Sequence, residues 1–224
     1  MEKAPINLTN MLLFSVTPLL AIILVPLYGY LDGYDLYEWL VFLGMMLFCG
    51  LSITAGYHRM WSHKAYKGHP FLRLIFALGG ACALQNDVMH GASDHPRHPR
   101  HVDQNELDPY SAGRGFWFSH IGWILRHYDS GKEDFSNIKD IQQDKVALWQ
   151  HQHYLILVLL TNIALPAFLG FLHGDIIACL LLGGLLRLVI SQHVTYLINS
   201  VAHMWGKQTY SDASSARDNP LLAL

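Results

Sequence analysis

The stretch LYEWLVFLGMMLFCGLSITAGYHRMWSH, residues 36–63, decides the fold, because an apolar run leads directly into two histidines. Residues 36–54 form a largely apolar run, and a helix of that length crosses a hydrocarbon core about 30 Å thick. His58 and His63 follow at once. An unpaired imidazole in hydrocarbon is costly, and imidazole is a common ligand of iron, zinc and copper. The pair therefore indicates a metal site at a membrane surface.

Composition is typical of a polytopic membrane protein. The 224 residues are 52% hydrophobic and only 14% charged. The formal net charge of -2 argues against a nucleic-acid partner, since no basic stripe is present to neutralise phosphates. Cys49, Cys82 and Cys179 are isolated within apolar stretches and are interpreted as small buried hydrophobes.

Four apolar runs predict four transmembrane helices in two hairpins, covering residues 12–30, 36–54, 154–172 and 176–198. Residues 57–151, between the hairpins, form a polar insert. We therefore expect an all-α membrane protein, organised as a single domain over residues 1–224, whose insert is a helical cap that carries the histidines. The run 71–84 in the insert is too short to cross comfortably and predicts an amphipathic or bundle-packed helix.

The basic residues predict the orientation. Eleven of the 15 lysines and arginines lie in the insert, whereas the short turns of the two hairpins hold none. By the positive-inside rule, the insert and both termini are expected in the cytoplasm. The short segment before the first span favours a bacterial cytoplasmic membrane. Arg187 falls within the fourth run, so it should face the bundle interior, pair with an acid or a carbonyl, or mark a span that tilts out of the hydrocarbon.

The spacing of His58 and His63 sets a geometric condition. Residues five apart on an α-helix point about 140° away from each other. The two histidines can therefore serve one site only if the helix ends or distorts between them.

Two further sets of polar residues have helical spacing. His95 and His98 are three apart in DHPRHPRH, residues 94–101, and Asn199 and His203 are four apart beyond the fourth predicted span. Each pair would share one face of a helix. Since all of these sets lie in the insert or at the same end of the spans, we expect them to converge on one site.

Four motifs, in order, carry a resemblance to a known family: GYHRMWSH (56–63), LQND (84–87), DPYSAGRGFWFSHIGW (108–123) and NSVAHMWG (199–206). From about Gly56 to its C-terminus the chain resembles the membrane-bound fatty acid desaturases, specifically the acyl-CoA delta-9, or stearoyl-CoA, group. The resemblance implies a diiron centre and an oxygen-dependent introduction of a cis double bond into a saturated acyl chain, in unsaturated fatty acid biosynthesis.

The resemblance also implies roles for individual residues. The metal ligands would be His58, His63, His95, His98 and His203, with Asn199 holding a metal-bound water. Arg114, Trp117, His120 and Trp123 would line or support the place where the acyl chain enters the cap. Outside the metal centre, no catalytic side chain is expected.

The implied partners are a substrate and an electron donor. The acyl group would arrive as a thioester of coenzyme A or acyl carrier protein, or as an acyl lipid. Electrons would come from a separate carrier, such as a ferredoxin or a cytochrome b5-like protein, since no dinucleotide, flavin or haem motif is visible.

The chain departs from the family pattern at the second histidine box. The family has H-R-x-H-H, whereas this chain has HPRHP at residues 95–99, so that Pro99 marks a lost ligand position. Just upstream, His90 and Gly91 stand where the family commonly has an acid and a tryptophan. The family's third box, H-N-x-H-H, normally follows a segment resembling residues 215–224. We therefore expect the domain to be C-terminally incomplete.

These departures predict weak metal binding. The resemblance calls for nine histidines, of which five are present in this sequence. We therefore expect at most one well-bound metal and impaired catalysis. Replacement of the lost ligand by His101 is an alternative, although Pro99 disrupts the helix on which that spacing relies.

Other functions stay open on this sequence. One is a non-enzymatic membrane protein that keeps the fold and a single zinc or iron site, and another is a membrane-bound hydroxylase on the same scaffold. The histidines without motif support, including His90, His151 and His193, are expected to be surface or interface residues.

Overall fold

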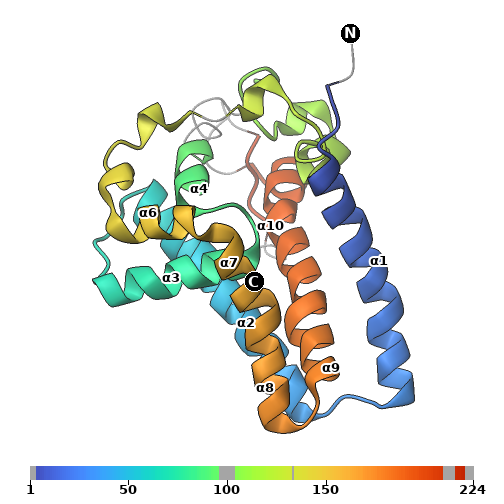
Figure 1. Cartoon of the computed structure of the whole chain (residues 1–224). Coiled ribbons are helices and arrows are strands. Elements are labelled where there is room, and N and C mark those ends of the chain that lie inside the picture. The colour runs from blue at the N-terminus through green and yellow to red at the C-terminus, as the bar shows by residue number, and fades with distance from the viewer. Residues whose placement is uncertain (1–3, 96–103, 133, 209–214, 220–224) are drawn as a thin grey trace. The chain divides into compact units, whose positions relative to one another are not determined.

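The structure, a computed structural model, describes residues 4–95, 104–132, 134–208 and 215–219. Its regular elements in these ranges are all helices, and no β-strand occurs among them (Figure 1). The chain divides into two compact units, residues 14–93 with 135–192, and residues 1–13 with 94–134 and 193–224. The single-domain organisation stays a prediction.

Four helical segments are long and apolar enough to cross a membrane, which confirms the all-α membrane fold. They end one to eight residues beyond the predicted spans, since helical hydrogen bonding continues where the hydropathy falls. The segments are α1 (Leu8–Leu31); α2 (Leu36–Leu51) with η1 (Ser52–Ser62); α7 (Tyr154–Leu159), η7 (Leu160–Ala164) and α8 (Leu165–His173); and α9 (Ile176–Cys179), η8 (Leu180–Leu186) and α10 (Arg187–Met204).

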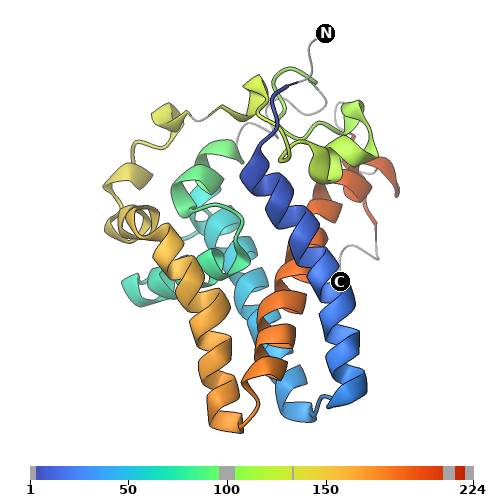
Figure 2. The same cartoon turned by 45° about the vertical axis from the view of Figure 1, so that its right-hand side comes forward.

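Local signals set the ends of the spans at the turns. The Asp35 side chain accepts hydrogen bonds from the backbone of Tyr37 and Glu38, and Glu38 accepts one from the Asp35 amide, so that α2 begins with a capping box. Gly174, at φ 103°, ends α8 in the left-handed conformation. Asp175 then caps α9, and the close succession of α8 and α9 is visible in both ribbon views (Figure 2).

The regular elements of the insert, in its described residues, are all helical. The predicted helix at 71–84 is confirmed as α3 (Pro70–Ala83), which ends at Leu84 in the left-handed region and is followed by α4 (Val88–Asp94) at a bend of 81°. Together α3 and α4 could also form a fifth, broken span by length and composition. The other elements are the π-helical η3 (Phe118–Gly122), α6 (Lys145–Gln152), and four short 3-10 turns: η2 (Ala112–Arg114), η4 (Asp129–Gly131), η5 (Phe135–Asn137) and η6 (Ile141–Gln143).

Two glycines of α3 allow η1 to approach closely. A Cβ atom on Gly79 would collide with the Ser52 hydroxyl, and one on Gly80 would collide with the Tyr57 ring. Tyr57 belongs to the hydrophobic core of the unit made of residues 14–93 and 135–192. Because only glycine leaves this space, α3 fixes the position of the segment that carries His58 and His63.

Arg187 is fully buried and pairs with carbonyl groups, as one of its predicted arrangements requires. Its guanidinium donates to the Cys82 carbonyl and to Asn162 Oδ1, both at 2.7 Å, and to the Gly183 carbonyl at 3.0 Å. These bonds offset the cost of a charge at this depth. The three cysteines are buried too, as predicted.

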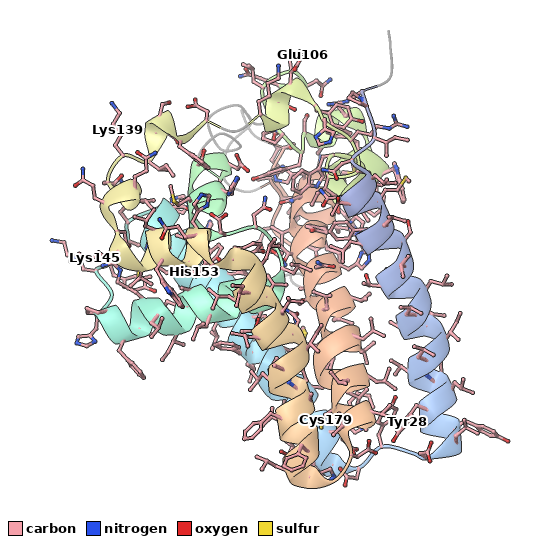
Figure 3. All side chains as sticks on the ribbon, in the orientation of Figure 1. Tyr28, Glu106, Lys139, Lys145, His153 and Cys179 are labelled. Carbon is pink, nitrogen blue, oxygen red and sulfur yellow. The ribbon has the colours of Figure 1, made fainter. Side chains whose placement is uncertain are left out.

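We predict that Arg187→Ala destabilises the fold strongly. Each buried acceptor left without a donor costs about 1–3 kcal/mol, so the free energy of unfolding should fall by at least ~3 kcal/mol. The measurement is denaturant unfolding in detergent micelles. Lys139→Ala is the control, because Lys139 is exposed and its side chain points outward (Figure 3). Equal stability of the two variants would contradict the prediction.

Candidate metal centre

The segment η1 is distorted between His58 and His63, as their spacing requires if both are to serve one site. It is π-helical, and the His63 amide donates to the His58 carbonyl, five residues back, at 2.9 Å. The Ser62 hydroxyl likewise donates to the Tyr57 carbonyl, five residues back, at 2.8 Å. This wider turn brings the Nε2 atoms of His58 and His63 to 3.2 Å from each other. A π-helical turn of this kind is rare and is found frequently at functional sites.

The distance between these nitrogens fits two ligands of one metal ion. With metal–nitrogen bonds of about 2.1 Å, two bound nitrogens lie about 3.0 Å apart at a right angle and about 3.4 Å apart at the tetrahedral angle. The observed 3.2 Å lies between these values. Both side chains are exposed, so an ion can reach them. Imidazole suits iron as well as zinc, and the donor set therefore agrees with the iron that the resemblance implies.

A partly buried ion pair, between Arg73 and Asp144, anchors the turn between the two histidines. Trp61, which is 4% exposed, donates from Nε1 to Asp144 Oδ2 at 2.8 Å. Asp144 also pairs with Arg73 of α3 and caps α6 by accepting from the backbone of Val146 and Ala147. Trp61 thus fixes the turn against α3, which follows it closely in sequence, and α6, which is remote from it.

Gln150 makes the second anchor of the turn. Its Nε2 donates to the Tyr57 hydroxyl at 2.5 Å and to the Ala77 carbonyl at 2.7 Å, and its Oε1 accepts from the Val88 amide at 2.8 Å. Gln150 is fully buried. One side chain of α6 therefore ties together η1, α3 and α4.

The remaining predicted ligands are placed only in part. His95 follows α4 directly, is half-buried and belongs to the unit made of residues 1–13, 94–134 and 193–224. Asn199 and His203 both lie on α10, four residues apart as expected, and His203 Nδ1 lies 2.8 Å from the Ser215 hydroxyl. His98, Pro99 and His101 lie outside the described residues. The ligand roles of these residues stay predictions.

Arg114 and Trp117 differ in their surroundings. The guanidinium carbon of Arg114 lies 3.6 Å from the centroid of the Phe118 ring and 4.5 Å from that of Tyr128, which is a cation–π arrangement. Trp117 is 66% exposed. The rings hold the Arg114 charge in place, whereas the Trp117 indole is largely exposed.

His120 lies at the centre of a small polar cluster. Its Nδ1 is 3.1 Å from the Ser200 hydroxyl and its Nε2 is 3.0 Å from His193 Nδ1. Burial, and then the neighbouring His193, lower the pKa of His120. Sequence reasoning missed His193, for which the only signal is its place two helical turns before Ser200. The fourth predicted residue, Trp123, packs against Tyr196 at a centroid distance of 6.1 Å.

The sequence of this chain is similar to those of known proteins. The fatty acid desaturase family pattern matches residues 37–224. The chain belongs to the fatty acid desaturase family. It is 38% identical over 176 residues to acyl-CoA desaturase 1 of Saccharomyces cerevisiae, covering 78% of this chain and 34% of the yeast protein.

Two animal desaturases give similar matches. Identity is 37% over 186 residues to the acyl-CoA desaturase of Cyprinus carpio, which covers 81% of this chain and 57% of that protein. It is 34% over 223 residues to stearoyl-CoA desaturase 4 of Mus musculus, which covers 97% of this chain and 61% of that protein. This desaturase-family chain thus spans about a third to three fifths of the length of these relatives.

We predict that Gln150→Leu loosens the turn that carries His58 and His63. It removes the partners of the Val88 amide, the Ala77 carbonyl and the Tyr57 hydroxyl, and each buried polar group left unpaired costs about 1–3 kcal/mol. Thermal unfolding in detergent should show a clear loss of stability. Gln152→Leu, on the exposed side of the same helix, is the matched control. If both variants unfold at the wild-type temperature, the anchoring role of Gln150 is wrong.

Proposed function

We propose that this membrane protein is a diiron acyl desaturase that uses dioxygen to introduce a cis double bond, at the delta-9 position, into a saturated acyl chain during unsaturated fatty acid biosynthesis. The observation that carries the proposal is the pair of imidazoles at 3.2 Å, held by a π-helical turn inside the family match. These two imidazoles would be the metal ligands that the family has in its first histidine motif.

The proposed ligands come from three motifs: His58, His63, His95, His98 and His203, with Asn199 acting through a water. When bound, the iron centre supplies the activation of dioxygen and the oxidation of the acyl chain. The protein's own groups hold the imidazoles in place, chiefly through the bonds of Trp61 and Gln150.

Residues of the insert are proposed to position the substrate. Trp117 offers an exposed indole to an acyl chain, and Trp123 and His120 support it from a packed cluster. Arg114, held between two aromatic rings, carries a positive charge suited to an acidic acyl carrier. The substrate would be an acyl thioester or an acyl lipid, and a ferredoxin or a cytochrome b5-like protein would supply electrons.

The orientation in the membrane is proposed from the charges. Eleven of the 15 basic residues lie in the insert, and the hairpin turns have none. The insert and both termini would therefore face the cytoplasm.

The second histidine motif is proposed to be weakened in this chain. Proline at 96 and 99 replaces the arginine and the third histidine of the family motif, so a ligand is missing and helical backbone is disfavoured there. Loss of supporting partners alone lowers metal affinity by about 10–100-fold. We therefore propose that this chain holds at most one metal well and is impaired as a desaturase.

The test is to express the full chain in membranes and to measure iron per chain together with the unsaturated fraction of the lipids. His63→Ala should lower the affinity for Fe²⁺ by at least ~10-fold, whereas His127→Ala, at an exposed histidine, should leave it unchanged. Pro96→Arg/Pro99→His should raise the iron content, because it restores the missing ligand.

Each part of the proposal can fail separately. Two irons per wild-type chain with new double bonds would contradict the impairment. Unchanged iron binding in His63→Ala would contradict the site. A restored variant that binds two irons, receives acyl-CoA and electrons, and still forms no double bond would favour a metal-binding protein without desaturase activity.

A further inference from the structure

A second group of metal-ligating side chains lies around Asp87, and shares no residue with the His58 and His63 pair. Asp87 Oδ2 is 2.7 Å from His90 Nδ1 and 3.0 Å from His151 Nδ1. Asp87 directly precedes α4, His90 lies on α4 and His151 lies on α6, all in one compact unit. Ligand atoms from the three residues lie within 4.8 Å of one another, so a single ion can contact all three.

The carboxylate of Asp87 is held in a fixed orientation. It is 5% exposed, and its Oδ1 accepts from the amides of Met89 at 2.8 Å and His90 at 3.1 Å. The other oxygen, Oδ2, is thereby directed at the two imidazoles. Backbone hydrogen bonds to one oxygen of a carboxylate, with the second oxygen free to ligate, are the usual support of a carboxylate in a metal site.

The two imidazoles are also positioned by packing, and they remain reachable. Phe135 lies edge-on to both rings, at centroid distances of 5.0 Å from His90 and 6.1 Å from His151. The two histidine rings lie 5.6 Å apart at a tilt of 34°. Their side chains are 20% and 32% exposed, which gives an ion and a water molecule access to the nitrogens.

We propose that Asp87 Oδ2, His90 Nδ1 and His151 Nδ1 bind a zinc ion, with a solvent molecule as the fourth ligand. Two neutral imidazoles and one carboxylate are a zinc donor set, and an open fourth position is typical of such three-ligand sites. The bound ion takes the place of the direct contacts between Asp87 Oδ2 and the two ring nitrogens. It joins α4 to α6 next to Gln150, so occupancy stabilises the fold by mass action.

The test uses the full chain, purified in detergent and stripped with a chelator, in a His58→Ala/His63→Ala background that removes the other pair. Zn²⁺ alone is added, and bound zinc per chain and the temperature of unfolding are measured. We expect one zinc per chain and a rise in that temperature. His90→Gln or His151→Gln should weaken zinc binding by at least ~100-fold and abolish the rise.

The control is His153→Gln, two residues further along the chain and exposed (Figure 3), which should bind zinc as the background does. His151→Cys gives a second test, which does not depend on the loss of metal binding. This variant should still bind Co²⁺ and should show a thiolate-to-metal absorption band that the background lacks. A folded background chain that binds no zinc would overturn the proposal. Zinc binding that is equal in the background, His90→Gln and His151→Gln would overturn it too.

Discussion

The hydrogen bond from the His63 amide to the His58 carbonyl, five residues back, is the constraint on which the candidate metal centre depends. In an α-helix the two side chains would point about 140° apart and could not share an ion. The wider turn brings their Nε2 atoms to 3.2 Å instead. Since a π-helical turn is unfavourable in isolation, contacts from elsewhere in the fold must hold it.

Those contacts are buried and polar. Trp61 bonds to Asp144, 83 residues away in sequence, and Tyr57 bonds to Gln150, 93 residues away. Gly79 and Gly80 leave the space in which η1 lies against α3. An α-helical register in η1 would leave these partners unpaired, so the geometry of the pair and the packing of the unit stabilise each other.

Much of the fold could be predicted from the sequence, because a span needs about 20 apolar residues and such runs are directly visible. The capping residue Asp35 and the helix-ending Gly174 are local signals of the same kind. Pairing of Arg187 inside the bundle was one of the arrangements predicted for a charge within an apolar run. The identity of its partners, Asn162 and the Cys82 carbonyl, was not predictable, because they come from other helices.

The candidate sites were predictable only where a motif marks them. The spacing of His58 and His63 showed that a distortion was needed, but its π form depends on remote contacts that no local pattern encodes. Likewise, His151 lies 64 residues from Asp87 in sequence, and no periodicity relates the two. His120 was expected from its motif, whereas its neighbour His193 lies on α10 before the motif at 199–206 and outside it.

The most direct test of the π-turn account is a metal-loaded structure of the full chain in lipid, with the ion located by anomalous scattering. The account predicts an ion bound by Nε2 of both His58 and His63, on a backbone that keeps the bond from the His63 amide to the His58 carbonyl. An ion bound by only one of these histidines, or an α-helical backbone through residues 58–63, would contradict it.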